Sequence, residues 1–364
     1  MGADGVVAGE PVSLAANSPF RVASHGELPN PWAMAFEPGS GRLFVTQQDG
    51  ELLVYDPATG QRNPVSGTPE VVYENQGGLG DIAFAPDYAS SGTIYLSWAQ
   101  DAGNDMTVAA VGRGQLDCAD SGACSITGFS EIWRQSRPAE KKGHYSHRIA
   151  FSPDGRYLFV ASGDRQEQTP AQDLSNNLGS IVRLTLDGRA APGNPFADRG
   201  GATQQIWSYG HRNILGLAFA PDGQLWEVEH GPKGGDELNL VQRGANYGWP
   251  VRSNGVNYND SNIPNHTADD GFTKPAAYWT PVIAPGDMAF YTGDMFGDWN
   301  GDLLIANLKV KSISRVTVDG DSAQEVARYD FPNRLRDIAV GPDGAIWVIE
   351  DEENGRLLRL TPKS

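Results

Sequence analysis

Long hydrophobic runs, positive charge and cysteine are all scarce in this sequence. No stretch approaches the roughly 20 consecutive apolar residues of a membrane-spanning helix, so we expect no membrane span. The first residues, Met1-Gly-Ala-Asp-Gly-Val-Val, lack a basic region followed by an apolar run, so no secretory signal peptide is visible there. Asp and Glu number 45 against 28 Lys and Arg, which gives a net charge of −17. Such an acidic surface argues against nucleic acid and anionic membranes as partners.

The two cysteines, Cys118 and Cys124, lie close together in Cys-Ala-Asp-Ser-Gly-Ala-Cys. A pair this close, around a turn that contains glycine, can close a small disulfide loop, which favours an oxidising compartment. Two free thiols are the alternative. No second pair of Cys or His stands nearby, so a zinc site is not indicated. We therefore expect a periplasmic or secreted protein.

Glycine and proline, by contrast, are plentiful and spread along the whole chain, with 44 Gly and 24 Pro among 364 residues. They accompany a recurring pattern: an apolar residue, Ala and Phe, a spacer, Pro-Asp-Gly or a variant, and then an alternating apolar segment. Pro and Gly favour a tight turn, and the alternation predicts a half-buried strand. Each copy is therefore expected to form a β-hairpin. The six copies begin at Met34, Ile82, Ile149, Leu217, Met288 and Ile338.

A single hairpin of this kind cannot bury both of its faces. Six four-stranded antiparallel sheets packed radially around an axis solve that problem, so the sequence predicts an all-β, six-bladed β-propeller. We expect residues 29–364 to form this single domain, and residues 1–28 to be an N-terminal extension that takes part in closing the propeller. The unequal spacing of the copies predicts long connecting segments at 101–145, 165–200 and 251–285.

Polar clusters flank the repeated hairpins, where equivalent positions of successive sheets would converge on the axis. They bring basic side chains together, and these would repel each other unless a polyanion lay among them. Arginine offers planar, bidentate contacts to carboxylates and phosphates. The sequence therefore predicts a funnel that binds an anion with several carboxylates or phosphates. The basic side chains are those of His144, Arg212, Lys309, Arg334 and Arg336.

Some of these residues also have simpler interpretations. Arg334 and Arg336 alternate on a strand, so both face one side, and they could be partners in surface ion pairs. His147 would face away from His144 and Ser146 in an extended segment and would then be structural. Two further histidines are expected to support the neighbouring backbone, namely His211 and His230.

Taken together, the clusters resemble those of the soluble quinoprotein sugar dehydrogenases, the pyrroloquinoline quinone (PQQ)-dependent family of aldose sugar dehydrogenases and soluble glucose dehydrogenases. The resemblance extends from about Pro29 to Pro362 and is closer to the broad-specificity aldose branch. It implies that the chain binds PQQ and calcium, oxidises aldose sugars at C1 to the lactone, and passes electrons to an external acceptor. The motifs that carry it are Gln76-Gly-Gly-Leu, His144-x-Ser-x-Arg, Leu178-Gly-Ser-Ile-Val-Arg-Leu, Gly210-His-Arg-Asn, Glu229-His-Gly-Pro, Gly248-Trp-Pro, Leu308-Lys and Asn333-Arg-Leu-Arg-Asp.

The resemblance also implies roles for single residues. His144 matches the general base that takes the proton of the anomeric hydroxyl, and Asp164 matches a sugar-side acid near that base. Arg212 and Asn213 match residues beside the quinone carbonyl. The other implied cofactor contacts are Gln76, Tyr258, Asn307, Lys309, Arg334 and Arg336. The implied calcium ligands are Gly231 and Pro232 at the cofactor, and Glu237 and Tyr247 at a second, structural site.

Two positions depart from the family pattern, and two other functions stay open. Gly143 stands where the glucose branch has an acid beside the base, and Lys233-Gly-Gly partly replaces acidic ligands after Gly231-Pro232. A calcium-dependent lactonase would need a central metal ringed by Glu, Asn and Asp side chains, and the basic funnel speaks against it. A non-catalytic propeller that binds protein or glycan would not need the basic set. The chain could be a monomer or a homodimer.

Overall fold

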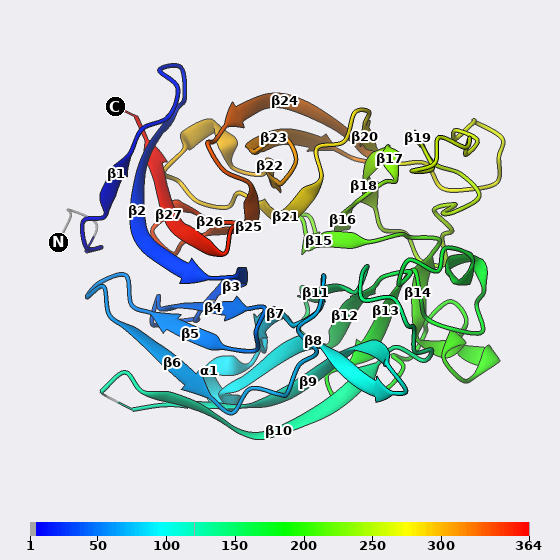
Figure 1. Ribbon diagram of the computed structural model, residues 1–364, viewed down its shortest axis with the longest axis horizontal. Helices are drawn as coiled ribbons and strands as arrows, with labels where there is room; N and C mark the ends of the chain where they lie inside the picture. The colour runs from blue at the N-terminus through cyan, green and yellow to red at the C-terminus, as the bar shows by residue number, and fades with distance from the viewer. Residues whose placement is uncertain (1–4, 120, 364) are drawn as a thin grey trace.

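The computed structural model describes residues 5–119 and 121–363, and these form an all-β structure (Figure 1). Its large sheets stand side by side around a common centre, and each extends from an inner strand near the centre to an outer strand at the periphery. Antiparallel pairing links consecutive strands within them. The expectation of an all-β chain with four-stranded antiparallel sheets is thereby confirmed. In the part of the chain that is described, no helix is long and apolar enough to cross a membrane.

Three of the sheets are four-stranded, and each follows the chain from the centre outwards. The first contains β11 (Ser146–Phe151), β12 (Tyr157–Ser162), β13 (Ser180–Thr185) and β14 (Ile206–Tyr209). The second contains β15 (Ile214–Phe219), β16 (Leu225–Glu229), β18 (Asp236–Leu240) and β20 (Ala277–Trp279). The third contains β21 (Pro285–Phe290), β22 (Leu303–Asn307), β23 (Ser312–Asp319) and β24 (Ser322–Asp330).

An eight-stranded sheet consists of two four-stranded units that meet at their outer strands. The join is a short parallel pairing of β6 with β10, in which Val65 lies opposite Cys124 and Ser66 opposite Ser125. The first unit contains β3 (Pro31–Phe36), β4 (Leu43–Gln47), β5 (Leu52–Tyr55) and β6 (Arg62–Ser66). The second contains β7 (Leu79–Phe84), β8 (Thr93–Gly103), β9 (Met106–Cys118) and β10 (Cys124–Arg134).

The last large sheet combines both ends of the chain in the order β1-β2-β27-β26-β25. Strand β2 pairs along β27, from Phe20 opposite Pro362 to Pro29 opposite Asn354. The N-terminal segment therefore completes a sheet whose other strands come from the C-terminus. The strands are β1 (Glu10–Val12), β2 (Phe20–Pro29), β25 (Leu335–Val340), β26 (Ile346–Glu350) and β27 (Asn354–Pro362).

The segments that connect the strands contain little regular structure, but residues 101–145 are an exception. The expectation of a long connecting segment at 101–145 was wrong, because β8, β9 and β10 continue through most of it. The buried run from Val108 to Val111 pairs with β8 on one side and β10 on the other, which extends both hairpins. The short elements are α1 (Tyr88–Ser91), the 3-10 turns η1 (Thr169–Gln172), η2 (Ala197–Arg199), η3 (Thr203–Gln205) and η4 (Gly297–Trp299), and the paired β17 (Lys233–Gly234) and β19 (Gly255–Val256).

The repeated Pro-Asp-Gly signal forms tight turns between inner and second strands, as between β11 and β12. Gly155 has a φ of +69°, a region that favours glycine, and its N–H donates to the carbonyl of Ser152. The carboxylate of Asp154 accepts hydrogen bonds from the N–H of Arg156 and the hydroxyl of Ser152. Local sequence thus fixes the hairpin register.

The hydrophobic core lies between neighbouring sheets. One cluster packs Tyr95 and Val111 against Leu158 and Val182 of the next sheet, and all four side chains are buried. The same arrangement recurs between the other neighbours, so both faces of each inner hairpin are covered. Burial on both faces is the reason why the apolar-Ala segments of the inner strands are hydrophobic on both sides.

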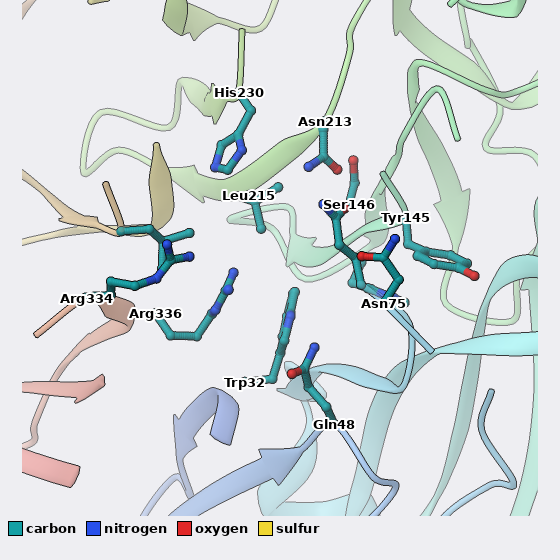
Figure 2. A pocket seen from close by; sticks show the side chains of 13 residues that line it. Trp32, Gln48, Asn75, Tyr145, Ser146, Asn213, Leu215, His230, Arg334 and Arg336 are labelled. Atoms are coloured by element: carbon teal, nitrogen blue, oxygen red, sulfur yellow. The ribbon is translucent and has the colours of Figure 1, made fainter. Parts of the chain in front are cut away.

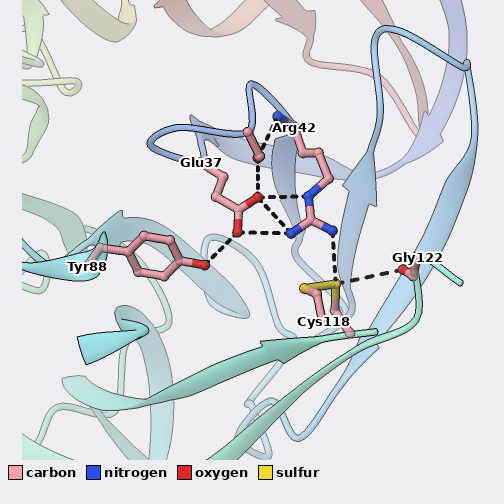
Figure 3. The surroundings of a disulfide bond; sticks show 7 residues. Glu37, Arg42, Tyr88, Cys118 and Gly122 are labelled. Atoms are coloured by element: carbon pink, nitrogen blue, oxygen red, sulfur yellow. Dashed lines mark hydrogen bonds and ion pairs between the residues drawn. A yellow bond between two sulfur atoms is a disulfide. The ribbon is translucent and has the colours of Figure 1, made fainter. Parts of the chain in front are cut away.

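The two cysteines form a disulfide where β9 and β10 are joined, far from the centre (Figure 3). Cys118 and Cys124 lie opposite each other in the strand register. Arg42 reaches the sulfur of Cys124 and pairs with the carboxylate of Glu37, which also accepts a hydrogen bond from the hydroxyl of Tyr88. The predicted disulfide is therefore present and packs against the neighbouring unit of the same sheet.

Candidate active site

A cavity of about 230 Å³ lies at the centre, where the inner strands β3, β7, β11, β15, β21 and β25 begin. These strands contact one another in that order, and β25 contacts β3. Figure 2 shows Arg334 and Arg336 on one side of the cavity, Asn75 and Ser146 on the other, and Trp32 between them. The lining residues are Trp32, Gln48, Asn75, Gln76, Tyr145, Ser146, His147, Asn213, Leu215, His230, Leu308, Arg334 and Arg336.

The floor of the cavity is built by a β-bulge near the start of each inner strand. In each inner strand, the residue two positions before the apolar residue of the repeated motif has no partner on the second strand. A bulge re-aims one side chain out of the regular alternation. The corresponding floor positions are Trp32, Gly80, His147, Leu215, Gly286 and Arg336, of which the four with side chains line the cavity.

Beneath this floor lies the buried guanidinium of Arg148. It donates to the carbonyls of Leu215 and Gly286, and its carbon lies 4.4 Å from the centre of the Trp32 ring. Its nitrogens lie 2.8 Å from Asp337, 3.4 Å from Asp287 and 3.5 Å from Asp81. One side chain from β11 thus contacts residues of all five other inner strands.

The basic wall of the cavity is formed by two arginines that share one carboxylate. Nε of Arg334 lies 2.6 Å from one oxygen of Asp351, and Arg336 donates to the other oxygen through Nε and a terminal nitrogen. Burial alone would raise the pKa of Asp351, but Arg336 and Arg334 outweigh burial and hold it below its usual value. One shared anion leaves the pair with a net positive charge toward the cavity. Arg334 and Arg336 therefore form ion pairs with Asp351 and line the cavity at the same time.

A buried dyad of His144 and Asp164 adjoins the cavity. Nδ1 of His144 lies 2.7 Å from Asp164, whose other oxygen accepts a hydrogen bond from the indole of Trp249. The backbone N–H of His144 donates to the side chain of Gln76, which lines the cavity. Burial lowers the pKa of His144 even though Asp164 opposes that shift. The imidazole is therefore neutral near pH 7, and Nε2 has no hydrogen-bond partner among the described residues.

The backbone around this dyad adopts conformations that are rare outside glycine. The φ angles are +50° at His144, +68° at Ser146 and +70° at His147. Such strain persists only where the surroundings over-determine it, and it often marks functional sites. It also breaks the alternation that we assumed for an extended segment: Ser146 and His147 both line the cavity, so the expectation that His147 faces away was wrong.

Arg212 lies beside the dyad and does not line the cavity. Its guanidinium lies between the rings of Trp249 and Tyr258, at 5.2 and 5.9 Å, and donates to the carbonyl of His230. Tyr258 is 73% exposed and accepts a hydrogen bond from Arg212. Asn213 follows Arg212 into the cavity wall, where its carbonyl oxygen is buried and has no partner.

The expected funnel of basic residues is therefore divided. The cavity wall contains Arg334 and Arg336, whereas Lys309 is exposed at the β22–β23 turn and is not among the lining residues. Asn307 does not reach the cavity either: it is fully buried, and its amide donates to the hydroxyls of Ser312 and Ser314 across that turn. The side-chain oxygen of Asn307 is buried without a partner, and the contact of Asn307 with the cofactor stays a prediction.

The implied calcium ligands surround a second, much smaller cavity. Gly231, Glu237 and Tyr247 line it together with Glu229, whereas Pro232 is buried but is not among the lining residues. The phenol of Tyr247 already binds the backbone of residues 240 and 242, so its hydroxyl is not free to bind a cation. Gly231 N–H donates to Asp236.

Two buried glutamates, Glu229 and Glu237, line this small cavity together with Arg212 and Arg252, and a third buried glutamate, Glu227, repels both. Burial, and then repulsion by Glu229, raise the pKa of Glu227 to about 7 and that of Glu237 well above its ordinary value. His211 lies within 3.3 Å of Glu227 and 3.5 Å of Glu229, and despite its burial these two carboxylates raise its pKa to about 9. His211 and His230 do bind neighbouring groups, since the ring of His230 contacts the carbonyl of Pro285. Closely spaced carboxylate oxygens are ligands that suit calcium.

Sequence reasoning missed four residues of the large cavity: Trp32, Gln48, Asn75 and Leu215. A signal for Trp32 was available: it stands two residues before Met34 of the repeat, just as Arg336 stands two residues before Ile338. Arg336 was predicted as a site residue because it is charged. Trp32, at the same repeat position in the first copy, was not predicted because tryptophan is common in hydrophobic cores.

The chain is similar to known proteins over nearly its whole length. The family model described as "Glucose / Sorbosone dehydrogenase" matches residues 28–359. The aldose sugar dehydrogenase YliI of Escherichia coli is 39% identical over 343 residues, which cover 93% of this chain and 91% of that protein. The crystal structure of the soluble aldose sugar dehydrogenase of Escherichia coli in the apo-form matches with a TM-score of 0.88 at 37% identity, covering 94% and 100% of the two chains. The PQQ-bound aldose sugar dehydrogenase of Streptomyces coelicolor matches with a TM-score of 0.78 at 27% identity, covering 96% and 100%.

Proposed function

The chain belongs to the glucose/sorbosone dehydrogenase family, and from this premise we propose that it is a quinoprotein aldose sugar dehydrogenase that oxidises aldoses with bound PQQ. The observation that carries the proposal is the central cavity, which has Arg334 and Arg336 in its lining and is adjoined, through Gln76, by the neutral, carboxylate-bound His144. An anionic oxidant and a base for the sugar hydroxyl could meet there.

The fold proposal that accompanies this function is a six-bladed β-propeller. The closed order of contacts among the inner strands supports it, because each inner strand would begin one blade. We further propose residues 29–364 as the single propeller domain and 1–28 as the extension that completes its last blade. The pairing of β2 with β27 supports this division, since β2 ends at Pro29.

The residues of the large cavity fit PQQ, a planar quinone with several carboxylates. Arg334 and Arg336 offer guanidinium donors for carboxylates, and among the lining residues of the described chain none is Asp or Glu. Gln76 and Asn213 add amide groups, and Arg212 with Tyr258 would border the bound group from the side of the dyad. Lys309, which is exposed near Leu308 of the wall, is proposed as a further contact that would need its side chain to turn inward. When bound, PQQ supplies the two-electron oxidant for C1 of the sugar.

His144 would then be the general base of the reaction. Its Nδ1 is engaged by Asp164, which leaves Nε2 to accept the proton of the C1 hydroxyl. Asp164 is fully buried, so it would act as a positioning residue that fixes the tautomer and orientation of the ring, and not as a group that touches the sugar. Arg212 would stabilise negative charge that develops near the dyad. The sugar would leave as its lactone.

Calcium is proposed at two sites, one held by Gly231 and Pro232 beside the cofactor and a second, structural one at Glu237 and Tyr247; Gly231, Glu237 and Tyr247 line the same small cavity. The buried, mutually repelling carboxylates of Glu227, Glu229 and Glu237 support a bound cation, because a cation would relieve their repulsion. Tyr247 could contribute through its backbone only, and Gly231 and Pro232 would contribute carbonyl oxygens. Calcium held by Gly231 and Pro232 would supply a Lewis acid near the cofactor.

The remaining parts of the proposal concern the surroundings of the enzyme. An external electron acceptor would take the electrons from the reduced cofactor. The disulfide supports a periplasmic or secreted location, because such bonds persist in oxidising compartments.

The test is dye reduction with glucose and a panel of aldoses, on protein incubated with PQQ and calcium, beside a His144→Ala variant. We expect activity that needs both additions and that falls by two or more orders of magnitude in the variant, the usual scale for a general base (about 10²–10⁴). Wild-type protein that binds PQQ but oxidises no aldose would overturn the proposed activity. Lactone hydrolysis would then be measured next.

A further inference from the structure

Trp32 presents an indole N–H at the floor of the large cavity without an acceptor in the protein. The side chain is only 4% exposed, yet it belongs to the lining of the cavity. Among the described residues, none accepts a hydrogen bond from its Nε1, whereas Trp133, Trp249 and Trp279 each donate to a side chain. Nε1 of Trp32 is not fully buried, so the N–H is open to the cavity, where an oxygen of a bound ligand could accept a hydrogen bond from it.

The ring of Trp32 is held firmly in this position. Arg148 lies under it at 4.4 Å, and the ring of His147 meets it edge-on, with 5.4 Å between centres and an angle of 82°. Arg148 is itself fixed by two backbone carbonyls and by Asp337. Trp32 also sits at a β-bulge, where Pro31 and Ala33 pair with Gln47 and Thr46 but Trp32 has no opposite residue. The indole therefore reaches into the cavity in a fixed orientation.

The charges of the residues around Trp32 indicate which kind of ligand atom would accept a hydrogen bond from the indole N–H. Arg336, which occupies the equivalent bulge of β25, and Arg334 stand on the side of the cavity next to Trp32 (Figure 2). Since the lining of the described chain contains no carboxylate, a cation is not favoured near the indole. An anionic or carbonyl oxygen is favoured, because it would accept from the indole while its charge is balanced by the arginines.

We propose that Trp32 is a further cofactor-contacting residue, whose indole N–H donates a hydrogen bond to an oxygen of the bound quinone polycarboxylate. This inference rests on the proposed function, because it takes PQQ as the occupant of the cavity. It adds a neutral donor at the floor to the guanidinium groups of the wall. Arg148 is the positioning residue for this contact, since it stacks on the ring and does not line the cavity.

The test is a titration of apo-protein with PQQ, followed by quenching of tryptophan fluorescence and checked by equilibrium dialysis. Trp32→Phe keeps an aromatic ring over Arg148 and removes the N–H. Trp133→Phe is the matched control, because it removes an indole N–H that donates to Gln205 at 3.0 Å outside the cavity. We expect Trp32→Phe to weaken PQQ binding roughly tenfold, the usual effect of deleting a hydrogen bond to a charged group. We expect Trp133→Phe to leave it unchanged, and both apo-variants to show native circular dichroism.

The outcomes separate the two proposals. If wild type binds PQQ and Trp32→Phe binds it equally well, the contact is refuted while the proposed function stands. If wild type itself binds no PQQ in dialysis, both proposals fall. If Trp133→Phe weakens binding as much as Trp32→Phe, the effect is a general loss of packing, and the contact is again refuted.

Discussion

Asp164 approaches His144 from within the protein: its carboxylate lies 2.7 Å from Nδ1 and is completely buried. Burial alone would raise the pKa of Asp164, but the hydrogen bond from His144, nearby positive charge and the bond from Trp249 hold it below its ordinary value. The carboxylate therefore stays ionised at neutral pH and can fix the imidazole in the tautomer that carries its proton on Nδ1. Nε2 is left as the basic atom.

Asp164→Asn should slow the chemical step and spare cofactor binding. The amide keeps the size of the side chain but loses the charge that orients the imidazole and stabilises its protonated form. We expect kcat to fall on the order of 100-fold or more, with the Kd for PQQ unchanged in dialysis. Asp154→Asn, in the exposed β11–β12 turn, is the matched control and should retain full activity. Equal losses of kcat and of PQQ binding would show that Asp164 supports the fold of the site instead.

When kcat is measured against pH, its decrease on the acidic side, the acidic limb, should have a midpoint below pH 6.5. Burial is the largest influence on His144 and lowers its pKa from 6.5, although Asp164 opposes it. A base that must be neutral remains active until the pH falls through this lowered pKa, and activity is lost below it. In Asp164→Asn the opposing carboxylate is gone, so the limb should move to still lower pH. The measurement is kcat against pH with saturating aldose, and a limb above pH 6.5 in wild type would contradict the assignment.

The overall architecture could be predicted from the sequence because its signals are local. Each hairpin is specified by its own turn, such as Pro153-Asp154-Gly155, and by its own alternation of apolar residues. Six weak copies together identify the fold because each needs neighbours on both faces. The extent of β9 and β10 was missed because it depends on long-range pairing that no local signal shows: β9 pairs with β8 and β10, and the start of β10 also pairs with β6.

The site was less predictable because its side chains leave the regular alternation. A bulge and positive φ angles direct Ser146 and His147 to the same cavity, and no rule of period two anticipates that. Asn307 is not among the residues that line the cavity: its motif lies at the end of β22, and its amide donates to hydroxyls of its own turn. Aligning the six copies against each other would have recovered Trp32, since its counterpart is Arg336.

Calcium should stabilise the apo-protein, and more so at alkaline than at acidic pH. Bound calcium requires ionised carboxylates, and burial raises the pKa of Glu227 to about 7 and that of Glu237 well above normal. Protonated Glu227 favours the folded apo-protein below about pH 4.5, its unfolded value, and this stability is lost as the pH rises through about 7. Calcium should offset that loss. We expect a larger calcium-dependent rise in Tm at about pH 8 than at about pH 5.5.

Glu237→Gln should remove most of this calcium-dependent rise, since it deletes one carboxylate of the small cavity. Glu131→Gln is the control, because Glu131 pairs with Arg134 on the surface. Scanning calorimetry with EDTA and with calcium measures both. A wild-type Tm that is the same with EDTA and with calcium at both pH values would exclude the site.

Arg148→Met should be the most destabilising single change at the centre of the molecule. The guanidinium is 4% exposed and faces Asp81, Asp287 and Asp337, so its removal leaves buried carboxylates without a counter-charge. Breaking a buried ion pair in this way costs about 3–5 kcal/mol. The loss should shrink at low pH, because burial raises the pKa of Asp81 to about 6 and that of Asp287 well above its ordinary value, so these groups become neutral on acidification.

Urea unfolding at about pH 8 and about pH 5 measures this difference. The matched control is Arg156→Met, whose side chain is 69% exposed and pairs with Asp154 on the surface; exposed pairs contribute only about 0–1 kcal/mol. If Arg148→Met costs no more than Arg156→Met at either pH, the buried carboxylates do not depend on Arg148. A loss that is equal at the two pH values would instead point to missing packing under Trp32, because only the electrostatic part follows the protonation of Asp81 and Asp287.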